Sequence, residues 1–171
     1  MRILAVLLCL LLVACNEDAT EMPRPVAMTE EALGYYCQMN VLEHAGPKGQ
    51  IHLAGMPMPV WFAQVRDGIA YVKSQERSAD ILAFYVNDMG AAPDWSDPGQ
   101  NNWIDANAAY FVVGSRATGG MGAPELVPFA NAADARAFAE DMGGRVRTLE
   151  EIAPEDVLAP VEISQVSGTA S

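Results

Sequence analysis

Apolar positions divide the chain into a hydrophobic start, a polar stretch and a long body of short apolar groups. The polar stretch, residues 16–30, carries two prolines and shows no apolar periodicity, which predicts a flexible tether. The C-terminal end is small and polar and is expected to be disordered. The predicted segments are a cleaved start 1–14, a tether 15–30, two folded units 31–95 and 105–158, and a tail 159–171.

Two parts of the body repeat one order of patterns. In each part a strand-like stretch precedes a turn rich in Gly, Met and Pro, and a short apolar strand then ends in Phe-Ala. Phe62 and Phe129 mark these positions, 67 residues apart. A helical pattern follows each one, so the sequence predicts an α+β fold made of two ββα-type units, each with a following strand.

The helix boundaries are clearest in the second unit. Asn131 is a favourable N-cap, residues 132–142 are rich in helix formers, and Gly143-Gly144 provides a stop. In the first unit we expect a helix near Val65–Val72, extended by Ala79–Met89. Residues 91–102 are rich in Pro, Asp and Asn and are predicted to form a loop between the units.

The hydrophobic start has the form of an export signal. Arg2 precedes the apolar run 3–13, and Leu12-Val13-Ala14-Cys15 matches a lipobox. We therefore expect residues 1–14 to be removed and Cys15 to carry lipid, which attaches the protein to a membrane of the cell envelope. No later apolar run is long enough to span a bilayer.

Charge narrows the range of partners. The chain has 22 acidic and 10 basic residues and a net charge of −12. Nucleic-acid binding needs a basic face, and the basic residues here are scattered, so nucleic acid is excluded as an expected partner.

Cys37 is the single thiol expected in the mature body, because Cys9 is removed with the signal and Cys15 is lipidated. It lies in Cys37-Gln38-Met39. Thiolate and thioether groups are soft ligands that select Cu(I) over hard cations. The alternative is that Cys37 packs as a small hydrophobic residue beside a core Met.

Three further residues are candidate ligands. His44 and His52 are the only histidines, and an imidazole is a plausible third ligand, although a surface His is the commoner outcome for either. Met121 is a large apolar side chain on a loop with three glycines, where little local packing is expected. Met56 and Met58 flank Pro57 and are predicted to be packing residues.

Motifs for other chemistries are missing from the sequence. It has no CxxC, HExxH or GxSxG motif, and Gly114-x4-Gly119-Gly120 lacks the lysine of a phosphate loop. Cys, His and Asp are all present, so a thiol hydrolase stays open at this point.

Two blocks of the sequence resemble a known family. Cys37-Gln38-Met39-Asn40-Val41-Leu42 runs on through Glu43-His44 to Gly46-Pro47-Lys48-Gly49-Gln50-Ile51, and Met121-Gly122-Ala123-Pro124-Glu125 comes later. Together with the lipobox, these blocks resemble the NosL family of nitrous oxide reductase accessory lipoproteins. The resemblance covers roughly residues 31–155.

The resemblance implies a fold, a cargo and partners. The fold would be two related ββαβ units, similar to part of the organomercurial lyase fold. The protein would be a periplasm-facing lipoprotein that supplies Cu(I) to nitrous oxide reductase through an ABC-type maturation complex. Cys37 and Met39 would be ligands, with Met121 a further candidate and His44 and His52 less certain ones. Asn16 after Cys15 favours the outer membrane.

Two other functions compete with a copper carrier. A thiol-dependent enzyme of organomercurial lyase type would need a second thiol near Cys37, and the mature body has none. A non-catalytic envelope scaffold would keep Cys37 inert and buried. Accessibility of the thiol to a labelling reagent separates the scaffold from the other two.

Overall fold

The computed structural model describes residues 22–75 and 77–160. The predicted signal, Cys15 and the tail beyond residue 160 lie outside these ranges. Within them, every helix is too short or too polar to cross a membrane.

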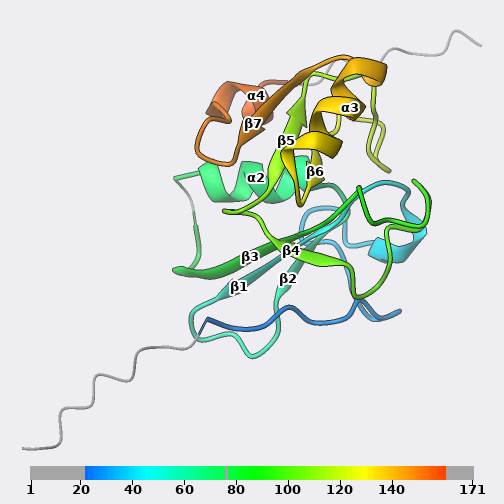
Figure 1. The fold of residues 1–171 in the computed structure, drawn as a ribbon. Coiled ribbons are helices and arrows are strands. Elements are labelled where there is room, and N and C mark those ends of the chain that lie inside the picture. The colour runs from blue at the N-terminus through cyan, green and yellow to red at the C-terminus, as the bar shows by residue number, and fades with distance from the viewer. Residues whose placement is uncertain (1–21, 76, 161–171) are drawn as a thin grey trace, which may run out of the picture.

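The first half of the structure is a four-stranded antiparallel sheet in the order β2-β1-β3-β4, shown in the lower part of Figure 1. A short 3-10 helix, η2 (Val41–Glu43), precedes the sheet. The other elements of the first half are β1 (Gly49–Leu53), β2 (Val60–Phe62), helix α2 (Val65–Lys73), β3 (Ile81–Asn87) and β4 (Trp103–Asp105).

The second half is a three-stranded antiparallel sheet in the order β6-β5-β7. Its elements are β5 (Tyr110–Val113), β6 (Val127–Phe129), helix α3 (Ala132–Met142), β7 (Arg145–Thr148) and helix α4 (Pro154–Leu158). The order β2-β1-β3 of the first sheet matches β6-β5-β7 of the second, and each helix lies between the second and third strand in the sequence. The predicted α+β class is therefore confirmed, with the chain order ββαβ in both halves.

One predicted helix is wrong. Residues 79–89 were expected to extend the first helix, but residues 81–87 form β3, a central strand paired with β1 and β4. Most of β3 is buried, so its apolar run is almost continuous and has no period of two. A run of this kind does not distinguish a buried strand from a buried helix.

The predicted boundary between the halves needs a correction as well. Residues 103–105 pair with β3, where Asp105 is the partner of Tyr85. The first sheet thus reaches residue 105, where the second unit was expected to begin. Ile104 packs against the core, and this burial stabilises the pairing of β4 with β3.

The predicted tether is wrong over its second part. Residues 22–30 run along the outer side of the first sheet (Figure 1). Met28 is only 2% exposed, and the Gln50 amide bonds both the N–H and the carbonyl of Val26, at 2.8 and 2.9 Å. The hydroxyl of Tyr85 donates to the carbonyl of Pro23 at 2.6 Å. A polar segment without periodicity is held here by hydrogen bonds between its main chain and the side chains of Gln50 and Tyr85, and by one buried side chain.

Helix α2 lies between the two halves (Figure 1), and its buried apolar residues belong to the main core. Ile69 packs in one cluster with Phe62 and Phe84 of the first sheet and with Phe111 and Ile152 of the second half. The core is therefore shared, and neither half buries its apolar face alone.

Two carboxylates also join the halves. Asp88, just after β3, accepts the N–H of Ala130 at 3.0 Å, before α3. Glu125, before β6, accepts the N–H of Arg66 at 2.9 Å in the first turn of α2. Each half thus supplies an acceptor where the helix of the other half begins.

Candidate metal site

Cys37 and Met39 lie in a tight turn beside the edge strand β2. Leu33 and Asn40 pair as an antiparallel bridge at its base. Inside it, the Gly34 N–H donates to the Met39 carbonyl and the Gln38 N–H to the Gly34 carbonyl, both at 2.8 Å. We call residues 33–40 the Cys-Met turn. It is fixed to β2 by the Tyr35 N–H, which donates to the carbonyl of Trp61 at 2.7 Å.

Gln38, between the two sulfur residues, holds the turn closed. Its φ of 56° lies in the left-handed region, which no other non-glycine among the described residues adopts. Its side-chain amide donates to the carbonyls of Tyr35 at 2.8 Å and Gly34 at 3.3 Å. These two hydrogen bonds offset the conformational cost of the left-handed backbone at Gln38. Cys37 and Met39 are therefore positioned by a turn and not by a strand.

The two sulfur side chains have different surroundings. Cys37 is half-buried and packs against the cluster of Met28, Trp61 and Ala63. Its Sγ lies 4.0 Å from the carbonyl oxygen of Met39. Met39 is 40% exposed. The turn therefore carries both a half-buried thiol and a thioether that is open to solvent.

Glycine at position 34 makes room for the thiol. A Cβ there would come within 2.5 Å of the Cys37 Sγ and 3.8 Å of the Ala63 Cβ. A side chain at residue 34 would therefore displace the sulfur.

Met121 sits at the tip of a long loop between β5 and β6. The Gly122 N–H donates to the Gly119 carbonyl and the Gly119 N–H to the Ala123 carbonyl, both at 2.9 Å. The tip reaches the first half, where the Met121 N–H donates to Oε1 of Gln64 at 3.2 Å. Met121 remains 38% exposed. Residues 117–125 are called the Met121 loop below.

The last residue of the Met121 loop carries a buried carboxyl that lies close to Gly119. Glu125 is 1% exposed, and burial raises its pKa to about 8. Its Oε1 accepts the N–H groups of Arg66 and Leu126, both at 2.9 Å, whereas Oε2 has no hydrogen-bond partner within the described structure. Protonation of the carboxyl lowers the cost of burying it at neutral pH.

The structure places His44 beside the Met121 loop. His44 follows η2, and the backbone of Gly120 lies so close to it that a Cβ on residue 120 would be 2.4 Å from the His44 Cβ. The His44 Nε2 is buried without a hydrogen-bond partner in the described structure. A buried imidazole nitrogen with no partner has a lone pair or proton available for another group.

His52 is engaged elsewhere. It lies near the far end of β1, about 10 Å along the strand from Gly49. Its Nε2 is 3.2 Å from the Gln50 Oε1, its ring packs edge-on against Tyr85, and burial lowers its pKa. The structure does not bring His52 to the Cys-Met turn.

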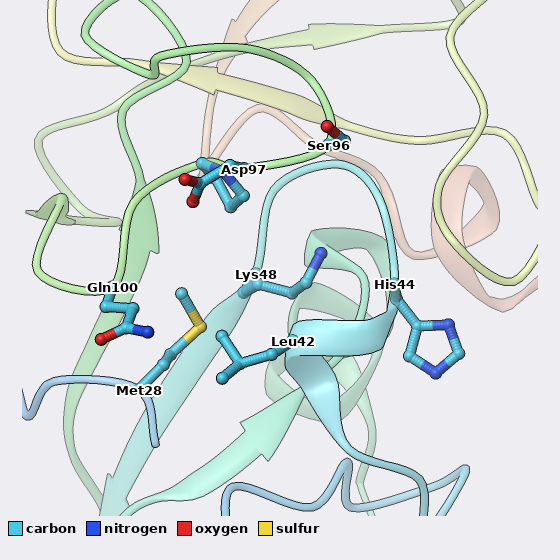
Figure 2. Close-up of a pocket in the computed structure, with 8 residues that line it drawn as sticks. Met28, Leu42, His44, Lys48, Ser96, Asp97 and Gln100 are labelled. Carbon is cyan, nitrogen blue, oxygen red and sulfur yellow. The ribbon is translucent and has the colours of Figure 1, made fainter. Parts of the chain in front are cut away.

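A cavity of about 270 Å³ lies next to η2, between residues 42–48 and the loop 96–100. Figure 2 shows Lys48 extending along it, while the His44 ring points away from Met28 and Gln100 on the opposite wall. Lys48 is buried, its ammonium donates to the Gly46 carbonyl, and burial lowers its pKa to about 8. Cys37, Met39 and Met121 do not line this cavity.

The prediction that Met56 and Met58 are packing residues is wrong. Met56 and Met58, predicted to pack, are 49% and 55% exposed in the loop between β1 and β2. About half of each side chain is therefore open to solvent. In the described part of the chain, no three His, Cys, Asp or Glu side chains gather as a metal-binding group.

Sequence reasoning missed three residues that build this region: Gln38, Gln64 and Glu125. Only Gln64 carried a usable signal. It occupies the position of Asn131 in the other half, directly before the helix, where Gln is an unusual N-cap. Its side chain makes no cap to its own helix, which leaves it free to bond the Met121 loop.

Comparison with known proteins agrees with this architecture. The NosL family model matches residues 25–157. The copper-binding lipoprotein NosL of Achromobacter cycloclastes is 55% identical over 153 residues, covering 89% of this chain and 79% of the relative. The protein of the same description from Stutzerimonas stutzeri is 35% identical over 153 residues, covering 88% and 78%.

Two solved structures are similar as well. The crystal structure of the copper chaperone NosL from Shewanella denitrificans has a TM-score of 0.71 at 32% identity, covering 76% of this chain and 96% of that one. The solution structure of apo-NosL from Achromobacter cycloclastes has a TM-score of 0.50 at 53% identity, covering 67% and 91%. The family model spans both halves, the Cys-Met turn and the Met121 loop, so this chain belongs to the NosL family.

Proposed function

We propose that this protein binds one Cu(I) ion through Cys37 and Met39 and delivers it to another protein. The observation that carries the proposal is the Cys-Met turn, a single hydrogen-bonded turn that holds a half-buried thiol and an exposed thioether two residues apart. The relatives described as copper-binding lipoproteins, and the structure described as a copper chaperone, support the same metal.

The ligand chemistry fits Cu(I). A thiolate neutralises the single positive charge, and a thioether adds a soft ligand that carries no titratable proton. Metal binding displaces the thiol proton, so capture of the ion releases a proton. The exposed Met39 leaves the site open to an incoming sulfur or nitrogen ligand, as transfer requires.

We assign Met121 and His44 as the candidates for a third ligand. The Met121 loop rests on Gln64 and touches His44 through Gly120. His44 is favoured over His52 because its Nε2 is buried without a partner in the described structure, whereas the His52 Nε2 already faces Gln50.

The partners follow from the family resemblance. The proposed recipient is the ABC-type complex that assembles nitrous oxide reductase, and through it the reductase itself. Lipid on Cys15 would hold the carrier at the periplasmic face of an envelope membrane, with the outer membrane favoured. Anchoring raises the effective concentration of the carrier near a membrane complex. No catalytic role is proposed for Cys37.

Anaerobic titration with Cu(I) against a competing chelator tests the binding site, using residues 16–171 without a tag. We expect one tight site per chain and much weaker binding of Zn(II). Cys37→Ser should abolish tight binding, because it removes both the charge and the strongest ligand, while Met39→Ala should weaken it. Wild-type affinity in Cys37→Ser, or Zn(II) binding as tight as Cu(I), would refute the proposal.

Delivery needs a separate experiment in cells. A Cys15→Ser variant, exported through a cleavable signal and expressed at the wild-type level, should keep its Cu(I) affinity. It should load less copper into nitrous oxide reductase when copper is scarce. Equal loading would show that the anchor is dispensable. A Cys37→Ser chain that keeps its lipid serves as the matched control for loss of the metal site alone.

A further inference from the structure

Gln64 occupies the point where the two halves meet near the candidate metal site. It lies between Ala63, whose Cβ is 3.8 Å from the Cβ position of Gly34, and Val65, the first residue of α2. The residue is almost fully buried. Its position ties it through the backbone to the strand that supports the Cys-Met turn.

The side chain of Gln64 is held at both ends of its amide. Nε2 donates to the Asp67 carboxylate at 3.2 Å, and Oε1 accepts the Met121 N–H at 3.2 Å. The bond to Asp67 fixes which end of the amide faces the Met121 loop. The oxygen is therefore presented to the backbone of the candidate ligand and cannot exchange places with the nitrogen without losing both bonds.

Gln64 is available for this contact because another residue caps its helix. A residue before a helix ordinarily accepts one of the free N–H groups of the first turn. In α2 the Glu125 carboxyl accepts the Arg66 N–H instead. Asn131, at the matching position of the other half, caps its own helix through Ala133 and Asp134 at 3.1 and 3.0 Å.

The loop approaches too closely for any side chain to intervene. A Cβ at Gly119 would lie 2.5 Å from the Gln64 Oε1 and 2.6 Å from the Glu125 Oε2. A Cβ at Gly120 would lie 2.4 Å from the His44 Cβ. The tip of the Met121 loop thus contacts Gln64 through Gly119 and His44 through Gly120.

We propose that Gln64 is a positioning residue that holds the Met121 loop against the first half and thereby places the Met121 thioether at the Cu(I) site. This inference rests on the proposed copper function. Met121 sits on a glycine-rich tip, and the Gln64 bond fixes its backbone relative to the first half. A fixed ligand binds more tightly than a mobile one, because less conformational freedom is lost on binding.

A mutant cycle on the metal affinity tests the inference. Gln64→Leu and Met121→Ala should each raise the Cu(I) Kd, by about tenfold, which corresponds to the net worth of roughly one contact. The double variant should be no worse than Met121→Ala alone, because Gln64 acts only through Met121. Gly119→Ala, which pushes the loop away from Gln64, should reproduce the effect of Gln64→Leu.

A second measurement separates positioning from general damage to the fold. With 13C-labelled methionine methyl groups, one equivalent of Cu(I) should shift the signals of both Met39 and Met121 in the wild type. In Gln64→Leu it should shift Met39 only. Gln50→Leu is the matched control, because Gln50 is also a buried glutamine bonded to a distant backbone segment, at Val26. It should keep the Met121 shift and the wild-type Kd.

The outcomes distinguish this inference from the proposed function. An unchanged Kd and an unchanged Met121 shift in Gln64→Leu would overturn the role of Gln64, as would additive effects in the double variant. An unchanged Kd in Met121→Ala would overturn it as well. Loss of binding in Cys37→Ser would support the copper site in each of these cases, whereas its retention would overturn the site itself.

Discussion

The carboxyl of Glu125 caps helix α2 from the other half of the molecule, with its Oε1 2.9 Å from the backbone nitrogen of Arg66. This bond joins residues 59 positions apart and lies beneath the Met121 loop. It also frees Gln64 from capping its own helix. The start of one helix, the connection between the halves and the support of a candidate ligand thus depend on one buried side chain.

The stability of the protein is expected to depend on the ionisation of Glu125. Burial raises the pKa of this carboxyl from 4.5 to about 8, so the folded protein binds a proton that the unfolded chain has lost between these values. The contribution of Glu125 to the free energy of unfolding should therefore fall as the pH rises from about 4.5 to 8, by at most ~1.4 kcal/mol per pH unit.

Glu125→Gln keeps an acceptor for Arg66 and removes this titration. In urea unfolding measured across pH 5–8, the variant should gain stability relative to the wild type as the pH rises. Lys48 does not produce this trend, because its lowered pKa of about 8 changes stability only above that value, where stability rises with pH. A constant difference between Glu125→Gln and wild type across pH 5–8 would contradict the prediction.

Gly34→Ala should weaken metal binding without removing a ligand. The new Cβ would lie 2.5 Å from the Cys37 Sγ, so the thiol must leave its rotamer or the turn must shift. An off-rotamer side chain costs about 0.5–1.5 kcal/mol, which corresponds to a rise in the Cu(I) Kd of up to about tenfold. Titration with Cu(I) against a competing chelator measures this rise in Kd. Gly55→Ala, on the exposed loop after β1, controls for the loss of a glycine, because a Cβ there meets no atom within 4 Å. Equal Cu(I) affinities in the two variants would argue against a clash between residue 34 and the Cys37 thiol.

The two histidines should differ in their effects. His44→Ala is expected to raise the Cu(I) Kd, because it removes the buried nitrogen next to the Met121 loop. His52→Ala should leave the Kd unchanged and lower the melting temperature, since it removes a buried ring packed on Tyr85. Metal titration and thermal unfolding of both variants test this, and the reverse pattern would move the third ligand to β1.

Met28→Ala should destabilise the protein by about 2–4 kcal/mol, as expected for a large buried side chain. Met28 is 2% exposed and packs with Val41, Trp61 and Ala63. Unfolding in urea measures the loss. Met22→Ala, at an exposed position of the same segment, is the control and should change stability little. If Met28→Ala were equally mild, residues 22–30 would not belong to the folded body.

Several features could be inferred from the sequence because their causes are local. Asn131 and Gly143 bound helix α3 at the predicted residues, since a cap and a stop act within one turn. The repeated Phe-Ala pattern predicted where the strand ends and the helix begins in both halves. The pair Cys37 and Met39 could be proposed as ligands for the same reason, because two sulfur side chains two residues apart are visible in the sequence without a fold.

Other features were decided only by the tertiary structure. Residues 81–87 became a strand because β1 and β4 lie on either side of them, and their buried apolar run contains no period that would reveal it. Gln64 and Glu125 became supports of the Met121 loop because α2 lies against the second half, which joins residues about 60 positions apart. The sequence alone determined the Cys37–Met39 spacing and the local helix signals, since these act between near neighbours. Burial, long-range hydrogen bonds and the different surroundings of His44 and His52 required the folded chain, because they depend on which distant segments come into contact.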